Sequence, residues 1–304
     1  MRVAVTGAGG RLGRALIAAL GDAPFTGPAG PTGWLREEFD LDTPWTIQRL
    51  LDRDRPEVVV HTAAWTDVDG CAREPGVAQR RNADAVGTVA EATAARGIDL
   101  VHISTNEVFD GGRPRDRGYL PDDPPAPANP YGASKLAGEA AAMAAYDRAA
   151  GRLAIVRTSW LYGPPGNDFP TKILAAAEGA ARRGEPLRVV GDEYGSPTYS
   201  HDLAEAIVDL LGSDDPDAPR GISHVVNTGV ASRADWAREL FGRLGMDVPI
   251  EQVPAASWRR ASTPPLWGVL DPTVPAGGEP MRPWQAALAD YLPLLRRQRI
   301  AAMP

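Results

Sequence analysis

Tyr131 and Lys135 are the two side chains of this sequence best placed for acid–base chemistry. They lie four residues apart, so in a helix they would share one face, about 6 Å apart along the axis. A nearby ammonium favours the phenolate, which predicts a Tyr131 pKa lowered toward the operating pH. Such a tyrosine can donate a proton to a carbonyl that is being reduced. The spacing is common by chance, and an exposed lysine beside a half-buried tyrosine is the alternative.

A glycine-rich loop near the N-terminus has the spacing of a phosphate-binding turn. Gly7, Gly10 and Gly13 follow an apolar run at residues 2–5 and open a helical pattern at residues 12–20. The first glycine permits a tight turn, the second admits the pyrophosphate, and the third lets helix and strand pack closely. The helix N-terminus adds N–H donors and a partial positive charge. The loop therefore predicts a dinucleotide site.

The residues that would distinguish NADH from NADPH follow this loop. An acid about 20 residues on would bind the ribose 2′-hydroxyl of NAD, and residues 26–33 offer none. The Arg36 guanidinium could meet a 2′-phosphate, which favours NADPH, with NADH possible; a solvated surface arginine is the alternative. Asp40 and Leu41 could lie near the adenine.

Composition narrows the class of protein. The 304 residues carry a net charge of -7 with no basic stripe, so we expect no nucleic-acid partner. Apolar runs are far too short for a membrane span, and the first strand begins at residue 2, which leaves no room for a signal peptide. Cys71 is the single cysteine and the four histidines lack ligand spacing, so we expect no disulfide, no metal site and a cytoplasmic location.

The first half alternates β-branched runs with Ala- and Leu-rich helical stretches. Strands are expected at residues 58–60, 100–103 and 153–156, and helices at 82–95 and 131–150. Continuous apolar strands separated by helices predict an α/β fold with a Rossmann-type, doubly wound parallel sheet. Ligands of such sheets bind at the carboxyl ends of the strands.

The chain also divides into two expected parts. We expect residues 1–157, with roughly 200–230, to form a dinucleotide-binding domain. Residues 158–199 and 231–304 would form a smaller C-terminal substrate-binding lobe, in which the Trp- and Pro-rich stretch from residue 249 predicts only short elements.

Further motifs occur in a fixed order along the chain. They are Ala63-Ala64, Ser104-Thr105-Asn106-Glu107-Val108-Phe109-Asp110-Gly111, Arg157-Thr158-Ser159-Trp160-Leu161-Tyr162-Gly163, Gly195-Ser196-Pro197-Thr198, Asn227-Thr228-Gly229 and Arg282-Pro283-Trp284. With the glycine loop and the Tyr131/Lys135 pair, this set resembles the extended short-chain dehydrogenase/reductases. Within them it resembles the dTDP-4-dehydrorhamnose reductase family, over nearly the whole chain.

The resemblance implies an NAD(P)H-dependent oxidoreductase of dTDP-rhamnose biosynthesis that reduces the C4 ketone of a nucleotide-linked 4-keto-6-deoxyhexose. Thr105 would hold the substrate carbonyl and Tyr131 would be the general acid. Lys135 would lower the tyrosine's pKa and bind the nicotinamide ribose. A homodimer is a possible assembly.

The resemblance also implies binding residues for each ligand. The cofactor set is Gly7, Gly10, Arg11, Leu12 and Gly13 at the pyrophosphate, Ala63 and Ala64 at a strand end, Thr66 beside them, and Asn82 supporting the lysine. The substrate set is Thr105, Asn106, Glu107, Trp160 packing on the sugar, and Asn167 and Phe169 flanking the nucleotide or sugar. For both alanines and Phe169, a role in the core is the alternative.

Several positions depart from the family pattern. Asn106 and Glu107 replace an Asp-Tyr pair whose tyrosine is expected near the sugar, so the hexose identity is open. The strand end reads His61-Thr62 in place of Asn-Ala, Ala72 replaces an acid, and Thr263-Pro264 replaces an Arg-Pro pair.

Two other functions remain open. A nucleotide-sugar epimerase or 4,6-dehydratase keeps its nicotinamide through the catalytic cycle, and Glu107 matches the acid of the dehydratases' Asp-Glu pair. A non-catalytic nucleotide-binding regulatory subunit is the other, although it would not need Thr105, Tyr131 and Lys135 together.

Overall fold

A six-stranded parallel sheet forms the centre of the computed structural model, which describes residues 1–213, 221–273 and 279–301. Its strands are β1 (Val3–Thr6), β2 (Thr32–Trp34), β3 (Val58–His61), β4 (Asp99–Thr105), β5 (Leu153–Thr158) and β10 (Gly221–His224). Their spatial order is β10-β5-β4-β3-β1-β2. The order reverses between β1 and β3, and ligands of such sheets bind at the carboxyl ends of the strands at this point. The predicted doubly wound α/β fold is confirmed.

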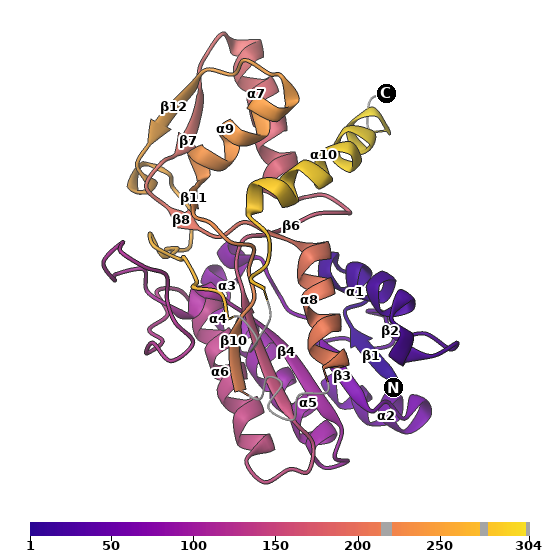
Figure 1. Cartoon of the computed structure of the whole chain (residues 1–304). Helices are drawn as coiled ribbons and strands as arrows, with labels where there is room; N and C mark the ends of the chain where they lie inside the picture. The colour runs from indigo at the N-terminus through magenta and orange to yellow at the C-terminus, as the bar shows by residue number, and fades with distance from the viewer. Residues whose placement is uncertain (214–220, 274–278, 302–304) are drawn as a thin grey trace.

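Helices cover both faces of this sheet (Figure 1). α1 (Arg11–Asp22) and α8 (Ser200–Gly212) pack on the face that presents Val3, Val5 and Val60. α2 (Ile47–Asp54), α5 (Ala85–Ala94) and α6 (Pro130–Tyr146) cover the face that presents Ala4 and Val59. Successive strand residues point to opposite faces, so both sides of each strand must be apolar.

Short helical elements join these parts. They are η1 (Pro24–Thr26), η2 (Pro44–Thr46), α3 (Val68–Arg73), α4 (Pro75–Gln79), the π-helical turn η3 (Arg80–Asp84) and η4 (Asn106–Val108).

A smaller lobe lies at the carboxyl end of the sheet (Figure 1). It contains β6 (Leu161–Tyr162), α7 (Phe169–Arg183), β7 (Leu187–Val190), β8 (Tyr194–Gly195), β9 (Thr198–Tyr199), β11 (Ala231–Ser232), α9 (Arg233–Leu244), β12 (Ile250–Val253), η5 (Ala255–Ser257) and α10 (Trp284–Ala301). Its core is separate from the sheet's and is rich in aromatic side chains, including Tyr162, Trp236 and Tyr291. This separation supports the two-part division, whose boundaries stay a prediction.

Two expectations about elements were wrong, and two strands of the sheet were missed. The C-terminal stretch ends in the 18-residue helix α10, which contains Pro293. Proline predicts a helix break, but Leu288 and Leu295 pack into the lobe core and hold the helix together. The helix expected at 131–150 ends at Tyr146. β2 and β10 were not anticipated, because they are short and each contains a glycine.

Within the described ranges, no helix has the length and apolarity needed to cross a bilayer. The same residues contain no group of three or more His, Cys, Asp or Glu side chains that could hold a metal ion.

Candidate active site

The N-terminal half of α6 carries the predicted acid–base pair. Asn129 caps the helix by accepting a hydrogen bond from the Gly132 N–H at 2.9 Å, and Pro130 occupies the first helical position. Tyr131 and Lys135 follow one turn apart and are both buried. A Cβ at Gly132 would overlap the Glu107 carbonyl oxygen, so glycine lets the helix start directly against η4.

Lys135 is held as a buried cation. Its Nζ donates to the Ile103 carbonyl oxygen at 2.7 Å. Burial lowers the pKa of Lys135 to about 8, while the Glu139 carboxylate one turn further opposes the shift. Glu139 itself is paired with the buried Arg157, Oε2 to Nη2 at 2.7 Å. The lysine is therefore mostly protonated at pH 7, although it is shielded from water.

The expectation of a lowered Tyr131 pKa was wrong. Burial raises the pKa of Tyr131, the Glu107 carboxylate raises it further, and the neighbouring Thr105 hydroxyl only partly opposes them. The Lys135 ammonium donates to the Ile103 carbonyl oxygen at 2.7 Å. Tyr131 therefore keeps its proton at neutral pH, which is the form that a proton donor needs.

The side chains of Thr105, Asn106 and Glu107, at the end of β4, have different hydrogen-bond partners. The Thr105 hydroxyl accepts from the Glu107 N–H at 3.2 Å and donates to Asn106 Oδ1 at 3.3 Å. Asn106 is buried and donates to the Gly268 carbonyl at 3.0 Å, so it ties β4 to the C-terminal lobe. Glu107 Oε2 accepts from Asn129 Nδ2 at 2.6 Å, and burial raises the pKa of this carboxyl.

The glycine loop has the close packing that its spacing predicts. Gly7 has φ +64°, and a Cβ there would lie 3.0 Å from the backbone of Ala63 at the end of β3. A Cβ at Gly13 would overlap the Gly7 carbonyl oxygen and lie 2.7 Å from Ala8 Cα. Gly10 donates its N–H to the Gly7 carbonyl at 2.8 Å, and no side chain caps α1. The first-turn N–H groups of α1 thus have no side-chain acceptor and are available to a phosphate.

Arg11 and Leu12 occupy this loop in different ways. The Arg11 guanidinium donates to the carbonyls of Gly163 (3.0 Å) and Gly166 (2.6 Å) and so links the loop to the lobe. The Leu12 side chain is buried in the sheet core, which leaves its backbone to face a phosphate.

The remaining cofactor candidates follow strands β2 and β3. Arg36 follows β2, is exposed, and pairs with Asp40 at 2.9 Å. Asp40 also accepts from the Asp42 N–H, and these contacts lower its pKa. Leu41 is half-buried against the core under α2 and α5. Ala64 is half-buried after β3 and Thr66 is exposed; both stay predictions.

Asn82 lies in the π-helical turn η3, a type of distortion frequent at functional sites. Its amide accepts from the Trp65 N–H at 2.8 Å and donates to the Trp65 carbonyl and to the Ser134 hydroxyl at 3.2 Å. It contacts the neighbour of Lys135 and not the lysine itself. Asn82 therefore fastens the segment after β3 to α6.

Trp160 forms part of an aromatic cluster in the lobe. The Arg233 guanidinium lies 3.5 Å from the centre of its ring, and Trp236 stacks on it at 5.8 Å. Phe169 also stacks on Trp236, at 4.6 Å. A sugar packed on the Arg233 side of Trp160 would have to displace that guanidinium. Asn167 is exposed in the preceding loop, with φ +57°.

A charged cluster beside this site was not anticipated from sequence. The buried Glu193 binds Arg233 (3.0 Å) and Arg260 (2.6 Å). All three act electrostatically on Glu107, so the cluster lies next to the predicted catalytic groups. Its members are up to 67 residues apart and share no local motif. Asn129, in contrast, has the sequence pattern of a helix N-cap, because it precedes a proline at a helix start.

Comparison with known proteins identifies the family. The family model described as RmlD substrate binding domain matches residues 1–297. A dTDP-4-dehydrorhamnose reductase of Mycobacterium tuberculosis is 37% identical over 297 residues, which is 96% of this chain and 92% of the relative. The chain belongs to the dTDP-4-dehydrorhamnose reductase family.

Two further members agree. A dTDP-4-keto-6-deoxy-D-glucose reductase of Streptomyces niveus is 34% identical, covering 96% of each chain. The crystal structure of a Bacillus anthracis dTDP-4-dehydrorhamnose reductase in complex with NADP superposes with a TM-score of 0.85 at 32% identity, covering 96% of this chain and 99% of that one. The predictions of family and of an oxidoreductase are confirmed.

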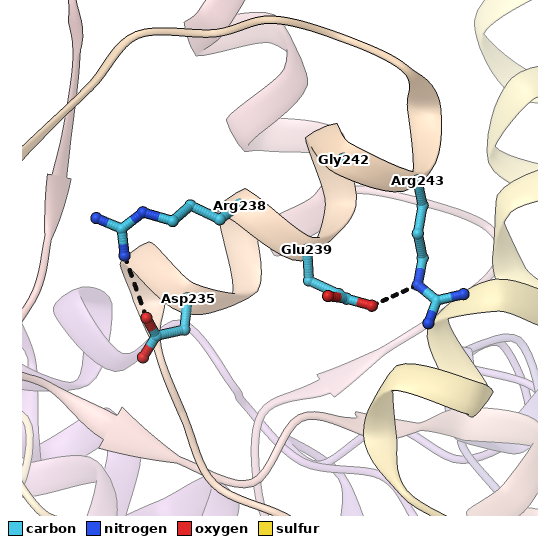
Figure 2. Close-up of a pocket in the computed structure, with 5 residues that line it drawn as sticks. All are labelled: Asp235, Arg238, Glu239, Gly242 and Arg243. Carbon is cyan, nitrogen blue, oxygen red and sulfur yellow. Dashed lines mark hydrogen bonds and ion pairs between the residues drawn. The ribbon is translucent and has the colours of Figure 1, made fainter.

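A hollow lies along helix α9 of the lobe, apart from the predicted site residues. It is lined by α9 alone, and two pairs along the helix neutralise its charges: Asp235 with Arg238 (3.2 Å) and Glu239 with Arg243 (2.6 Å) (Figure 2). None of the predicted site residues lines it, so it offers no catalytic group.

Proposed function

We propose that this protein reduces the C4 ketone of a dTDP-linked 4-keto-6-deoxyhexose with NADPH. The observation that carries the proposal is that Tyr131 and Thr105 are both buried and lie close together, one at the start of α6 and the other at the end of β4. Both are at the carboxyl end of the sheet that also bears the glycine loop. The loop fits a dinucleotide, since Gly7 leaves space where a Cβ would press on Ala63 and the α1 N-terminus has no side-chain cap. The Bacillus anthracis relative crystallised with NADP supports this cofactor.

The residues divide the reduction between them. Bound NADPH supplies the hydride that adds to C4 of the sugar. The Thr105 hydroxyl, whose single proton now goes to Asn106 Oδ1, would turn it to the ketone oxygen. Tyr131 delivers a proton to that oxygen as its negative charge develops. Lys135 contributes positive charge and holds the nicotinamide ribose. The C4 carbonyl becomes a hydroxyl, the proton comes from Tyr131, and solvent restores it.

Glu107 also fits a second function, that of a nucleotide-sugar dehydratase or epimerase. A carboxylate beside Tyr131 would suit a dehydratase, which removes a proton from carbon and retains its nicotinamide; an epimerase likewise retains its nicotinamide. The high identity to reductases argues for the ketoreductase. These relatives are named for two different 4-keto sugars. The choice between these two hexoses is therefore left to the experiment.

The test is loss of NADPH or NADH absorbance with a panel of 4-keto nucleotide-sugars that includes dTDP-4-dehydrorhamnose and dTDP-4-keto-6-deoxyglucose. The proposal expects NADPH oxidation that depends on the nucleotide-sugar and a freely exchanging cofactor. A tightly retained nicotinamide with net dehydration or epimerisation would replace it with the second function. Binding without any turnover would indicate a regulatory subunit.

We further propose a cytoplasmic location and a homodimer, and no nucleic-acid partner. The net charge of -7 supports the last point. Light scattering of the purified protein would distinguish a dimer from a monomer.

A further inference from the structure

A row of polar side chains crosses the sheet behind Lys135. Thr6, His61 and His102 are register partners on β1, β3 and β4, and each is at most 1% exposed. They lie two residues beyond Ala4 and Val59, on the same face under α5 and α6. An apolar row is thus followed by a polar one, just below the carboxyl ends of the strands.

Direct contacts connect this row to Lys135. Lys135 Nζ lies 3.4 Å from His102 Nε2. The His102 and His61 rings stack with centroids 5.7 Å apart. His61 Nδ1 is 2.8 Å from the Thr6 hydroxyl, which accepts from the Ala63 N–H at 3.2 Å. The row therefore runs from the predicted catalytic lysine to the carboxyl ends of β1 and β3.

Both imidazoles are neutral in this setting. Burial lowers the pKa of His61 to about 3 and the pKa of His102 well below its ordinary value, and the Lys135 charge adds to both shifts. A neutral His102 that accepts from the ammonium on Nε2 carries its proton on Nδ1. The other charge that acts here is Glu139, which raises the pKa of Lys135 and is itself paired with Arg157.

Lys135 consequently has two of its three N–H groups assigned. One goes to the Ile103 carbonyl and one to His102 Nε2, because an ammonium has three donors and no acceptor. The third is left for a ligand. Two fixed acceptors restrict the rotation of the ammonium group, so they also set the direction of this third donor.

We propose that His102 is a positioning residue: it holds the Lys135 ammonium through Nε2, backed by the stacked His61, and so aims the remaining N–H at the cofactor. Its importance for reduction rests on the proposed function, but its effect on Lys135 does not. A bulk-filling role in the core is the competing explanation, and the two differ in what a change at His102 does to the lysine.

The sequence allows a direct test, since it contains only two lysines, Lys135 and the exposed Lys172. Lysine labelled with ¹³C at Cε then gives two side-chain signals, which Lys172→Arg assigns. The pH titration of the Lys135 signal is followed in the wild type, His102→Leu and His102→Gln. The matched control is His224→Leu, which removes another buried neutral histidine, one that contacts the Tyr119 carbonyl.

Loss of the acceptor in His102→Leu should move the Lys135 titration to lower pH by about one unit. In His102→Gln, whose side-chain oxygen can reach the Nε2 position, most of that shift should disappear. His224→Leu should leave the Lys135 signal unchanged. Titrations of His102→Leu and the wild type that coincide, in folded protein, would overturn the proposal, as would equal shifts in the leucine and glutamine variants.

The same variants separate this proposal from the reductase assignment. NADPH affinity, measured by fluorescence without a sugar, should weaken more steeply above pH 7 in His102→Leu than in the wild type. If no nucleotide-sugar is reduced by the wild type, the proposed function fails while the lysine titration still decides the role of His102. If His102→Leu does not fold, a Lys135 titration in His102→Gln that lies about one unit or more below that of the wild type would contradict the proposal.

Discussion

The Glu107 carboxylate raises the pKa of the Tyr131 phenol, so the predicted proton donor is coupled to the residue that departs most clearly from the family pattern. Asn129 holds Glu107 by a hydrogen bond of 2.6 Å, and Glu193 opposes its charge from the lobe side. Two carboxylates therefore shift the pKa values of the acid–base pair: Glu107 raises the pKa of the tyrosine, and Glu139 raises that of the lysine.

Glu107→Gln should stabilise the protein at neutral pH. The folded-state pKa of Glu107 is raised above its unfolded value, so the folded protein bears an unfavourable charge above that pKa and none below the unfolded pKa. The variant's gain in free energy of unfolding should thus be present at pH 7 and vanish toward pH 4, as measured by urea denaturation. Glu57→Gln is the control of opposite sign, because the Arg2 N–H lowers the pKa of Glu57. A gain at position 107 that does not change with pH would contradict the burial of this charge.

Lys135→Met should abolish turnover and yet stabilise the fold near pH 7. Burial lowers the pKa of Lys135 from its ordinary value of 10.5 to about 8, so the charged folded state is penalised by up to about 3 kcal/mol. The penalty is complete below pH 8 and disappears as the pH rises toward 10.5, where the unfolded lysine also loses its proton. Unfolding free energies of variant and wild type should therefore converge between about pH 8 and pH 10; a constant difference would refute the shift.

Gly13→Ala should disrupt the dinucleotide loop. Its Cβ would lie 2.7 Å from Ala8 Cα and overlap the Gly7 carbonyl oxygen, both of which are backbone and cannot easily move. We expect a loss of about 1–3 kcal/mol in stability and a marked weakening of NADPH binding, measured by fluorescence titration. Gly21→Ala in the same helix is the control, since nothing lies within 4 Å of its Cβ, and it should be neutral or stabilising by up to about 1 kcal/mol. Unchanged NADPH affinity in Gly13→Ala would show that the loop does not bind the cofactor.

Arg36→Ala should weaken NADPH binding roughly tenfold and leave NADH binding nearly unchanged, since the guanidinium would meet only a 2′-phosphate. Arg36 is exposed and paired with Asp40, so its removal should alter stability by less than about 1 kcal/mol. Arg53→Ala, at another exposed paired arginine, is the control. Equal losses of affinity for NADPH and NADH, or no loss for either, would show that Arg36 does not contact the 2′-phosphate.

The sequence predicted those features that depend on local chemistry. The glycine spacing, the strand–helix alternation and the Tyr131/Lys135 spacing each reflect constraints within a few residues of one another. The direction of the Tyr131 pKa was missed because it depends on Glu107 and on burial, which arise only when η4 packs against α6. The Glu193–Arg233–Arg260 cluster was missed for the same reason, since its members meet only through the fold of the lobe.

Helix α10 shows the limit of residue propensity. Pro293 argued for short elements, but the helix is held by leucines and Tyr291 in the lobe core, whose burial outweighs the loss of one backbone hydrogen bond. Tertiary packing of this kind cannot be read from a proline alone.

The central claim is that Tyr131 delivers the proton to the C4 oxygen of a nucleotide-linked sugar. The most direct measurement is single-turnover oxidation of bound NADPH by dTDP-4-keto-6-deoxyhexose in the wild type and in Tyr131→Phe, together with the NADPH dissociation constant of each. We predict a rate lower by roughly 10²–10⁴ in the variant, with NADPH affinity within about threefold of the wild type. A Tyr131→Phe variant that oxidises NADPH at the wild-type rate would contradict the account.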